Sequence, residues 1–189
     1  MTETTRAYQE AEPPSSTYVP GSGVPHPGRS RTKGETPPTP PIAGDAWGDS
    51  PAYLRGVDLF NAGFYWEAHE AWEALWHAHG RRGPVALLLK GLIKMAAAGV
   101  KVRQGRPAGV RSHAARAAGH FTAVRAEVGP SLLGLDLDGW IDFARSVAGR
   151  PPETPDAPGG SAVVVFTRRL TPGGDSPASG ATRPPAAGP

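Results

Sequence analysis

The chain has 189 residues, a formal net charge of +3 and no cysteine, which excludes disulfides, zinc–thiolate sites and thiol nucleophiles. No apolar run reaches the roughly 20 residues that a membrane-spanning helix needs. The first residues lack the basic start and apolar stretch of a signal peptide. We therefore expect a cytoplasmic protein without a membrane segment.

Proline divides the chain into three parts. Of its 22 prolines, nine lie in residues 1–50 and nine in residues 151–189. Proline-rich terminal segments of this kind bury too little apolar surface to offset the conformational entropy that the chain loses when it becomes ordered. The sequence predicts a disordered tail over 1–47, one helical domain over 48–148 and a mostly disordered tail over 149–189. For the apolar patch 162–166, docking on the domain and a short binding motif remain alternatives to disorder.

Within the domain, apolar residues recur at spacings of three and four, which is typical of amphipathic helices. Five helices are predicted: one that begins at Ser50-Pro51 and is ended by Gly63, and four over about 65–79, 84–103, 107–128 and 137–148. Gly63 and Gly105 lie at two similar helix–turn–helix corners, as in tetratricopeptide-type hairpins. We expect a compact all-α fold of two helical hairpins plus a C-terminal helix, with an apolar connection over 132–137.

Charge is segregated along the domain. Residues 56–80 contain no lysine or arginine, whereas residues 90–126 contain eight and no acidic residue. The simplest interpretation is an ionic network between Glu67, Glu70 and Glu73 on one side and Lys90, Lys94, Arg111 and Arg116 on the other. A weaker alternative is anion or nucleic-acid binding through 90–126. Phe121 is the only aromatic residue there, which disfavours stacking on single-stranded nucleic acid.

The second predicted helix concentrates the chemistry. On a helical wheel of roughly 100° per residue, Ala68, Ala71 and Leu75 lie opposite an arc of about 160° that is rich in aromatic and ionisable side chains. That arc contains Trp66, His69, Glu70, Trp72, Glu73, Trp76 and His77. The pattern predicts a helix packed on both faces, with its carboxylates beside buried tryptophans.

Besides the ionic network, this helix has two other interpretations. One is a polar pocket for a small ligand or peptide, lined by Trp66, Glu67, His69, Glu70, Trp72, Glu73, Trp76 and Lys94. The other is a metal site that uses the i, i+4 pair His69 and Glu73 together with His113 and His120. The stretch His-Glu-Ala-Trp-Glu lacks the second histidine of the zinc-protease motif.

For catalysis, His69 is the candidate general base, with Glu70 and Glu73 as neighbouring carboxylates. This pattern would suit a metal-dependent or acid–base hydrolase. No nucleophile elbow, phosphate loop or dinucleotide-binding glycine pattern accompanies it, and no cofactor is predicted.

Two stretches together resemble the bacterial and archaeal family called domain of unknown function 309. They are Phe60-Asn61-x-Gly63-x-Tyr65-Trp66-Glu67-Ala68-His69-Glu70-x-Trp72-Glu73-x-x-Trp76 and Leu89-Lys90-Gly91-Leu92-Ile93-Lys94-Met95-Ala96-Ala97-Ala98. The resemblance covers about residues 52–125 and implies a small all-helical array without an established activity. It puts Glu67, His69, Glu70, Trp72, Glu73 and Trp76 at signature positions.

The chain departs from the family pattern in the third helix. The family often has glutamine where Lys94 stands and histidine near Lys101, a difference that favours the ionic network. Our leading hypothesis is a non-catalytic binding or scaffold module centred on the second helix. The expected partner is a small molecule or a protein, nucleic acid is disfavoured, and a homo-oligomer is left open.

Overall fold

The computed structural model describes residues 12–26 and 39–174. It contains the 3-10 helix η2 (Trp47–Asp49) and the helices α1 (Pro51–Asn61), α2 (Tyr65–Ala78), α3 (Gly83–Arg103), α4 (Pro107–Val128) and α5 (Leu137–Gly149). The predicted all-α fold and its five helices are confirmed, and the predicted bounds of α2 to α5 lie within one residue of the observed ones.

No helix in the described part of the chain is both long and apolar enough to cross a membrane. The cytoplasmic location stays a prediction.

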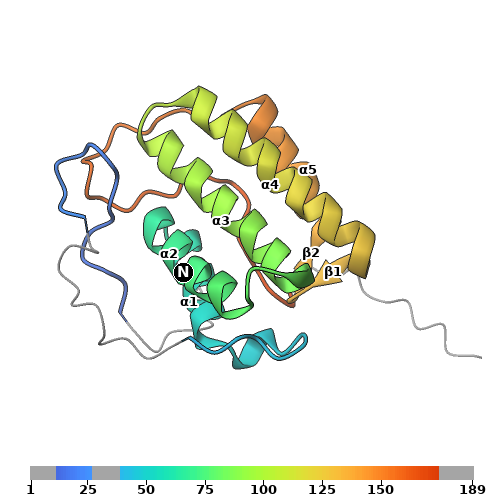
Figure 1. Cartoon of the computed structure of the whole chain (residues 1–189). Helices are drawn as coiled ribbons and strands as arrows, with labels where there is room; N and C mark the ends of the chain where they lie inside the picture. Colours follow the sequence, from blue (N-terminus) through green and yellow to red (C-terminus); the bar gives the residue numbers. More distant parts are fainter. Residues whose placement is uncertain (1–11, 27–38, 175–189) are drawn as a thin grey trace, which may run out of the picture.

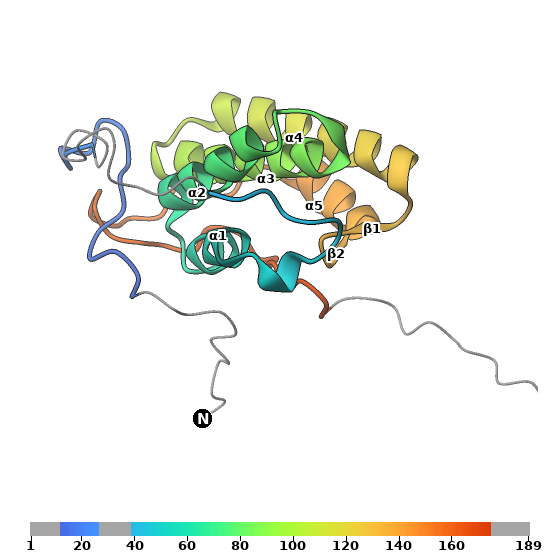
Figure 2. The same cartoon turned by 60° about the horizontal axis from the view of Figure 1, so that its bottom comes forward.

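The helices form two hairpins and a cap. Helices α1 and α2 pair, α3 and α4 pair, and α5 packs along α4, so α3 lies between α2 and α4 (Figure 1). Figure 2 shows α1 in a lower layer than α3 and α4. The central place of α3 follows from its sequence, since it has buried apolar residues along its whole length.

The two helical corners are glycines in the left-handed backbone region. Gly63 has φ 85° and Gly105 has φ 63°. Side chains rarely adopt this region, and glycine enters it without steric cost. At the other end of α1, Ser50 caps the helix because its Oγ accepts a hydrogen bond from the Tyr53 N–H at 3.3 Å. Gly63 and Gly105 thus lie at the two corners that the sequence predicts.

The core takes one face of α2. Tyr65, Ala68, Trp72 and Leu75 are each at most 2% exposed. They face α1 and α3, where glycines allow large rings to reach the helix backbone. A Cβ on Gly99 would lie 2.5 Å from Cγ of Tyr65.

The connection after α4 is a short antiparallel pair, β1 (Ser131–Leu132) and β2 (Leu135–Asp136). Between them Leu133 has φ 49°, a conformation that costs a non-glycine residue roughly 1–2 kcal/mol. Its side chain is fully buried, its N–H donates to Asp45 Oδ1 at 2.6 Å, and its carbonyl accepts from Tyr53 Oη at 3.0 Å. The predicted apolar connection is therefore a turn that two hydrogen bonds and a buried leucine hold in place before the start of α5.

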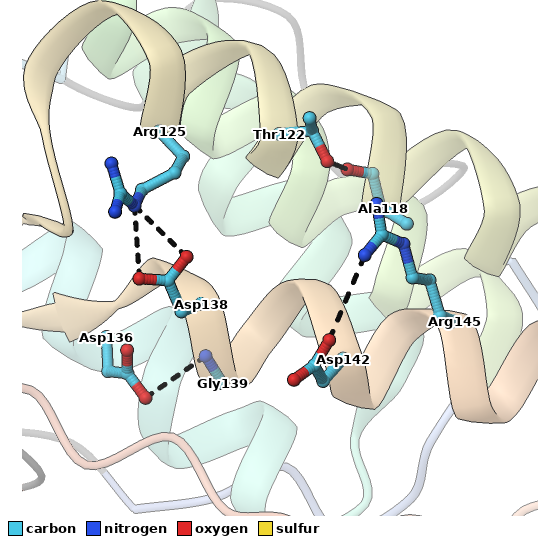
Figure 3. Close-up of polar contacts among 8 residues, drawn as sticks. All are labelled: Ala118, Thr122, Arg125, Asp136, Asp138, Gly139, Asp142 and Arg145. Carbon is cyan, nitrogen blue, oxygen red and sulfur yellow. Dashed lines mark hydrogen bonds and ion pairs between the residues drawn. The ribbon is translucent and has the colours of Figure 1, made fainter.

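Polar contacts between α4 and α5 lie on the surface. Arg125 Nε donates to both carboxylate oxygens of Asp138 at 3.0 and 3.1 Å, and Asp136 caps α5 through the Gly139 N–H at 3.1 Å (Figure 3). Exposed ion pairs contribute at most about 1 kcal/mol. The buried face of α5, with Trp140 at 2% exposure, accounts for most of its attachment.

Described segments of both predicted tails pack on the helices. We call residues 12–26 the N-terminal strap and residues 158–171 the C-terminal strap. The second turns back from the end of α5 toward α1 and α2 (Figure 1). Thr17, Val19, Phe166 and Leu170 are each at most 5% exposed. Of the alternatives for the patch 162–166, the structure shows the one in which the patch packs on the helical domain. The tail residues 1–11, 27–38 and 175–189 lie outside the described residues.

A pair of glycine substitutions tests the packing. Gly99→Ala should lower the free energy of unfolding by about 1–3 kcal/mol, because its Cβ would overlap the Tyr65 ring. Gly119→Ala in α4 should instead raise it by about 0.5–1 kcal/mol, because no atom lies within 4 Å of the new Cβ. Urea unfolding measures both, and equal effects would contradict the packing.

Candidate functional site

The stretch that joins α1 to α2 holds the backbone of the C-terminal strap. The Asn61 side chain donates from Nδ2 to the Leu170 carbonyl at 2.7 Å and accepts from the Leu170 N–H at Oδ1 at 2.8 Å. One amide side chain thus satisfies both backbone groups of one residue, as a neighbouring strand would. This contact does not depend on the side chain of residue 170.

Two further motif residues extend this contact. A Cβ on Gly63 would lie 2.5 Å from the carbonyl carbon of Val163, so glycine is required for the strap backbone to approach. The Tyr65 hydroxyl accepts a hydrogen bond from the Val165 N–H at 2.9 Å. Burial raises the pKa of Tyr65 to about 12, so its phenol stays protonated at neutral pH.

The strap adds an apolar anchor and a second set of backbone contacts. Phe166 stacks on Phe60, with ring centroids 5.6 Å apart, and meets Tyr65 edge-on at 5.3 Å. At the end of α3, Arg103 donates to the carbonyls of Ser161 and Pro158, both at 2.9 Å. The result is a segment without regular secondary structure that is held by hydrogen bonds to its main chain and by a buried aromatic side chain. We call the surface that holds it, made of Phe60, Asn61, Gly63, Tyr65 and Arg103, the peptide groove.

The N-terminal strap occupies the next turn of α2. Glu67 accepts hydrogen bonds from Thr17 Oγ1 at 2.7 Å and from the Tyr18 N–H at 2.8 Å. The Tyr18 ring covers Trp66 edge-on, with centroids 4.8 Å apart. The two straps also touch, because the Thr17 N–H donates to the Gly160 carbonyl at 2.9 Å.

The predicted acid–base pair is brought close but not into a hydrogen bond. His69 Nδ1 lies 4.0 Å from Glu73 Oε2 and is buried without a hydrogen-bond partner. Burial lowers the pKa of His69, Glu73 opposes that shift and Lys94 adds to it, so the imidazole favours its neutral form. Glu70 is half-buried one residue further on. Proton transfer at His69 therefore stays a hypothesis.

The histidines proposed as metal ligands lie on α2 and α4, and the charge of His69 acts on His113. Burial, and then the charge of Lys94 and other bases, lowers the pKa of His113, and His120 responds in the same direction. Across residues 12–26 and 39–174, no three side chains of the ligating types His, Asp and Glu form a group that could hold a metal ion. The metal hypothesis gains no support from the geometry.

The predicted ionic network is not formed by Glu67 and Glu73. Among the described residues, neither of these two carboxylates makes an ion pair with a base of α3 or α4. Glu67 is engaged by the N-terminal strap, and Arg111 donates to the carbonyls of Ala148 and Gly149. The partners of Glu67 and Arg111 are thus the Thr17 hydroxyl and backbone groups of neighbouring segments.

The tryptophans also divide differently from the prediction. Trp72 is fully buried on the same face as Ala68 and Leu75, and its Nε1 donates to the Tyr53 carbonyl at 3.3 Å. Trp66 and Trp76 are only partly buried beside the core. The expectation that all three tryptophans are buried opposite Ala68 and Leu75 was wrong, because Trp72 lies at the edge of its arc, next to the core face.

Asn61, Gly63, Tyr65 and Arg103 were missing from the predicted site. The first three stand in the signature stretch, so the signal was present in the motif. Their role could not be predicted because their partner, the C-terminal strap, lies about 100 residues further along the chain.

Comparison with known families matches residues 53–113 to the family described as Domain of unknown function (DUF309). This confirms the resemblance drawn from the motifs, over a shorter range than expected, and leaves both straps outside the match. No curated protein and no solved structure matched the chain in the same comparisons.

Glu67→Ala should release the N-terminal strap. Loss of two hydrogen bonds to a carboxylate, worth about 1.5–3 kcal/mol each, should raise amide hydrogen exchange at Tyr18 and its neighbours by tenfold or more. Glu73→Ala on the same helix is the matched control and should leave that exchange unchanged. Unchanged protection in the Glu67 variant would show that Glu67 does not anchor the strap.

The stability of the protein should fall as the pH drops below about 7. A histidine with a lowered folded pKa binds its proton more readily in the unfolded chain, so its contribution is full above 6.5 and is lost as the pH falls toward the folded pKa. Urea unfolding between pH 8 and pH 5 should show this slope, and His69→Gln should reduce it. An identical slope in the variant would mean that His69 titrates as in the unfolded chain.

Proposed function

We propose that the helical domain, whose residues 53–113 match the family described as Domain of unknown function (DUF309), is a non-catalytic module that binds a peptide through main-chain contacts. In this chain the C-terminal strap occupies the groove. The observation that carries the proposal is the double hydrogen bond between the Asn61 side chain and the backbone of Leu170. A side-chain amide used in this way recognises a peptide backbone of any sequence.

The other contacts support the same interpretation. Added strands bind their partner by main-chain hydrogen bonds for affinity and by side-chain pockets for specificity. Here Tyr65 and Arg103 extend the main-chain contacts, and the site of Phe166 between Phe60, Tyr65 and Phe143 is the pocket. The groove thus combines both parts of a peptide-binding site.

A cleavable form of the full chain tests the proposal. A protease recognition sequence placed in residues 151–156, where Glu153, Thr154 and Asp156 are exposed, would cut the covalent link between α5 and the strap. A labelled peptide of residues 157–174 should then bind the cut protein in a fluorescence anisotropy titration. It should bind the uncut protein far more weakly, because the tethered strap competes.

Asn61→Ala should weaken that peptide about tenfold or more, because two hydrogen bonds of about 0.5–1.5 kcal/mol each are lost. A peptide with an N-methyl group on Leu170 removes one of the two donors and should also bind more weakly. Controls are Arg145→Ala on the exposed face of α5 and a peptide with Thr167→Ala, at an exposed position. Equal binding of the Asn61 variant, with its helical content intact, would refute main-chain recognition.

A further inference from the structure

A second surface, between α3 and α4, has cationic side chains that the fold does not use. Lys90, Lys94, Arg116 and His120 line an open pocket there together with Gly119. No atom lies within 4 Å of the position that a Cβ on Gly119 would take, so that side of the pocket is clear. The surface involves none of the strap contacts.

The other bases of the segment 90–126 are mostly engaged by the chain itself. Lys101 donates to Gln104, Arg125 to Asp138, Arg103 to the C-terminal strap and Arg111 to the end of α5. Within residues 12–26 and 39–174, Lys94 and Arg116 make neither a hydrogen bond nor an ion pair, and the Lys90 ammonium lies 5.9 Å from the Trp76 ring centroid. The available positive charge is therefore concentrated at one place and does not run along the helices.

This concentration of charge is unfavourable without an anion. Lys90 and Lys94 stand one turn apart on the same helix face, an arrangement of like charges that destabilises a helix. Residues 90–126 include no acidic residue that could compensate. Burial first, and then Lys90 and Lys94, lowers the pKa of His120, which is consistent with a positive potential in the pocket.

We propose that the α3–α4 pocket binds a phosphate-type dianion through Lys90, Lys94, Arg116 and His120. The guanidinium of Arg116 can offer two parallel donors to phosphate oxygens, and the two lysines supply compact charges. A single phosphate group fits this site better than a long polyanion, because the neighbouring bases along α3 and α4 already have partners. The proposal does not depend on the peptide groove.

The test uses inorganic phosphate and the full chain. At constant ionic strength, phosphate should raise the melting temperature more than chloride does, and ³¹P line broadening should give a saturable affinity. Lys94→Gln and Arg116→Gln should each weaken that affinity about tenfold, whereas Arg106→Gln, at an exposed position outside the pocket, should not change it. A nucleoside monophosphate measured in parallel distinguishes free phosphate from a phosphate ester as the preferred ligand.

Gly119→Glu gives a second variant that does not risk the fold. Glutamate favours a helix more than glycine does and would place a tethered carboxylate in the pocket, so the melting temperature should rise and the response to phosphate should disappear. An equal response to chloride, or an equal loss in Arg106→Gln, would overturn the site and indicate general screening. A short single-stranded DNA should bind no more tightly than phosphate. If it binds more tightly, and if Arg106→Gln weakens its binding as much as Lys94→Gln and Arg116→Gln do, the compact phosphate site is refuted in favour of an extended surface for polyanions.

Discussion

An extended stretch of chain can be buried only where each backbone N–H and C=O group finds a partner. The C-terminal strap meets this requirement without a sheet, since the only strands in the described residues are β1 and β2. Side chains of the helices supply the partners instead, above all Asn61, which satisfies both groups of Leu170. Phe166 and Leu170 can then cover the aromatic side of α1 and α2, so the apolar core of the helical array is completed by a segment without regular secondary structure.

The helices were predictable because their signals are local. Gly63 and Gly105 end helices since they enter left-handed backbone conformations, and Ser50 starts one as a cap. Apolar spacing identified the five helices, because each buries one stripe of side chains. The fold class therefore followed from residues that act within a few positions of themselves.

The site was less predictable because its partners are distant in sequence. Composition marked residues 149–189 as a tail, yet Phe166 and Leu170 within it are buried by contacts with α1 and α2. Glu67 belonged to the predicted site, but its partners are Thr17 and Tyr18 and not a base of α3. A helical wheel could not separate Trp72 from Trp66 and Trp76, because the direction of the core depends on which helices lie beside α2.

In the proposed function, the connection between α5 and the C-terminal strap decides how tightly a competing peptide has to bind. The short linker of residues 150–157 keeps the strap beside its groove and gives it an effective concentration on the order of millimolar. A peptide from another protein would have to overcome that local concentration, so weakly binding sequences would be excluded while the linker is intact. The contact between Thr17 and Gly160 couples the two straps, so a competitor that displaced one would also loosen the other. In the proposed peptide-binding module, the length of the linker would therefore set the affinity that another peptide needs, together with the chemistry of the groove.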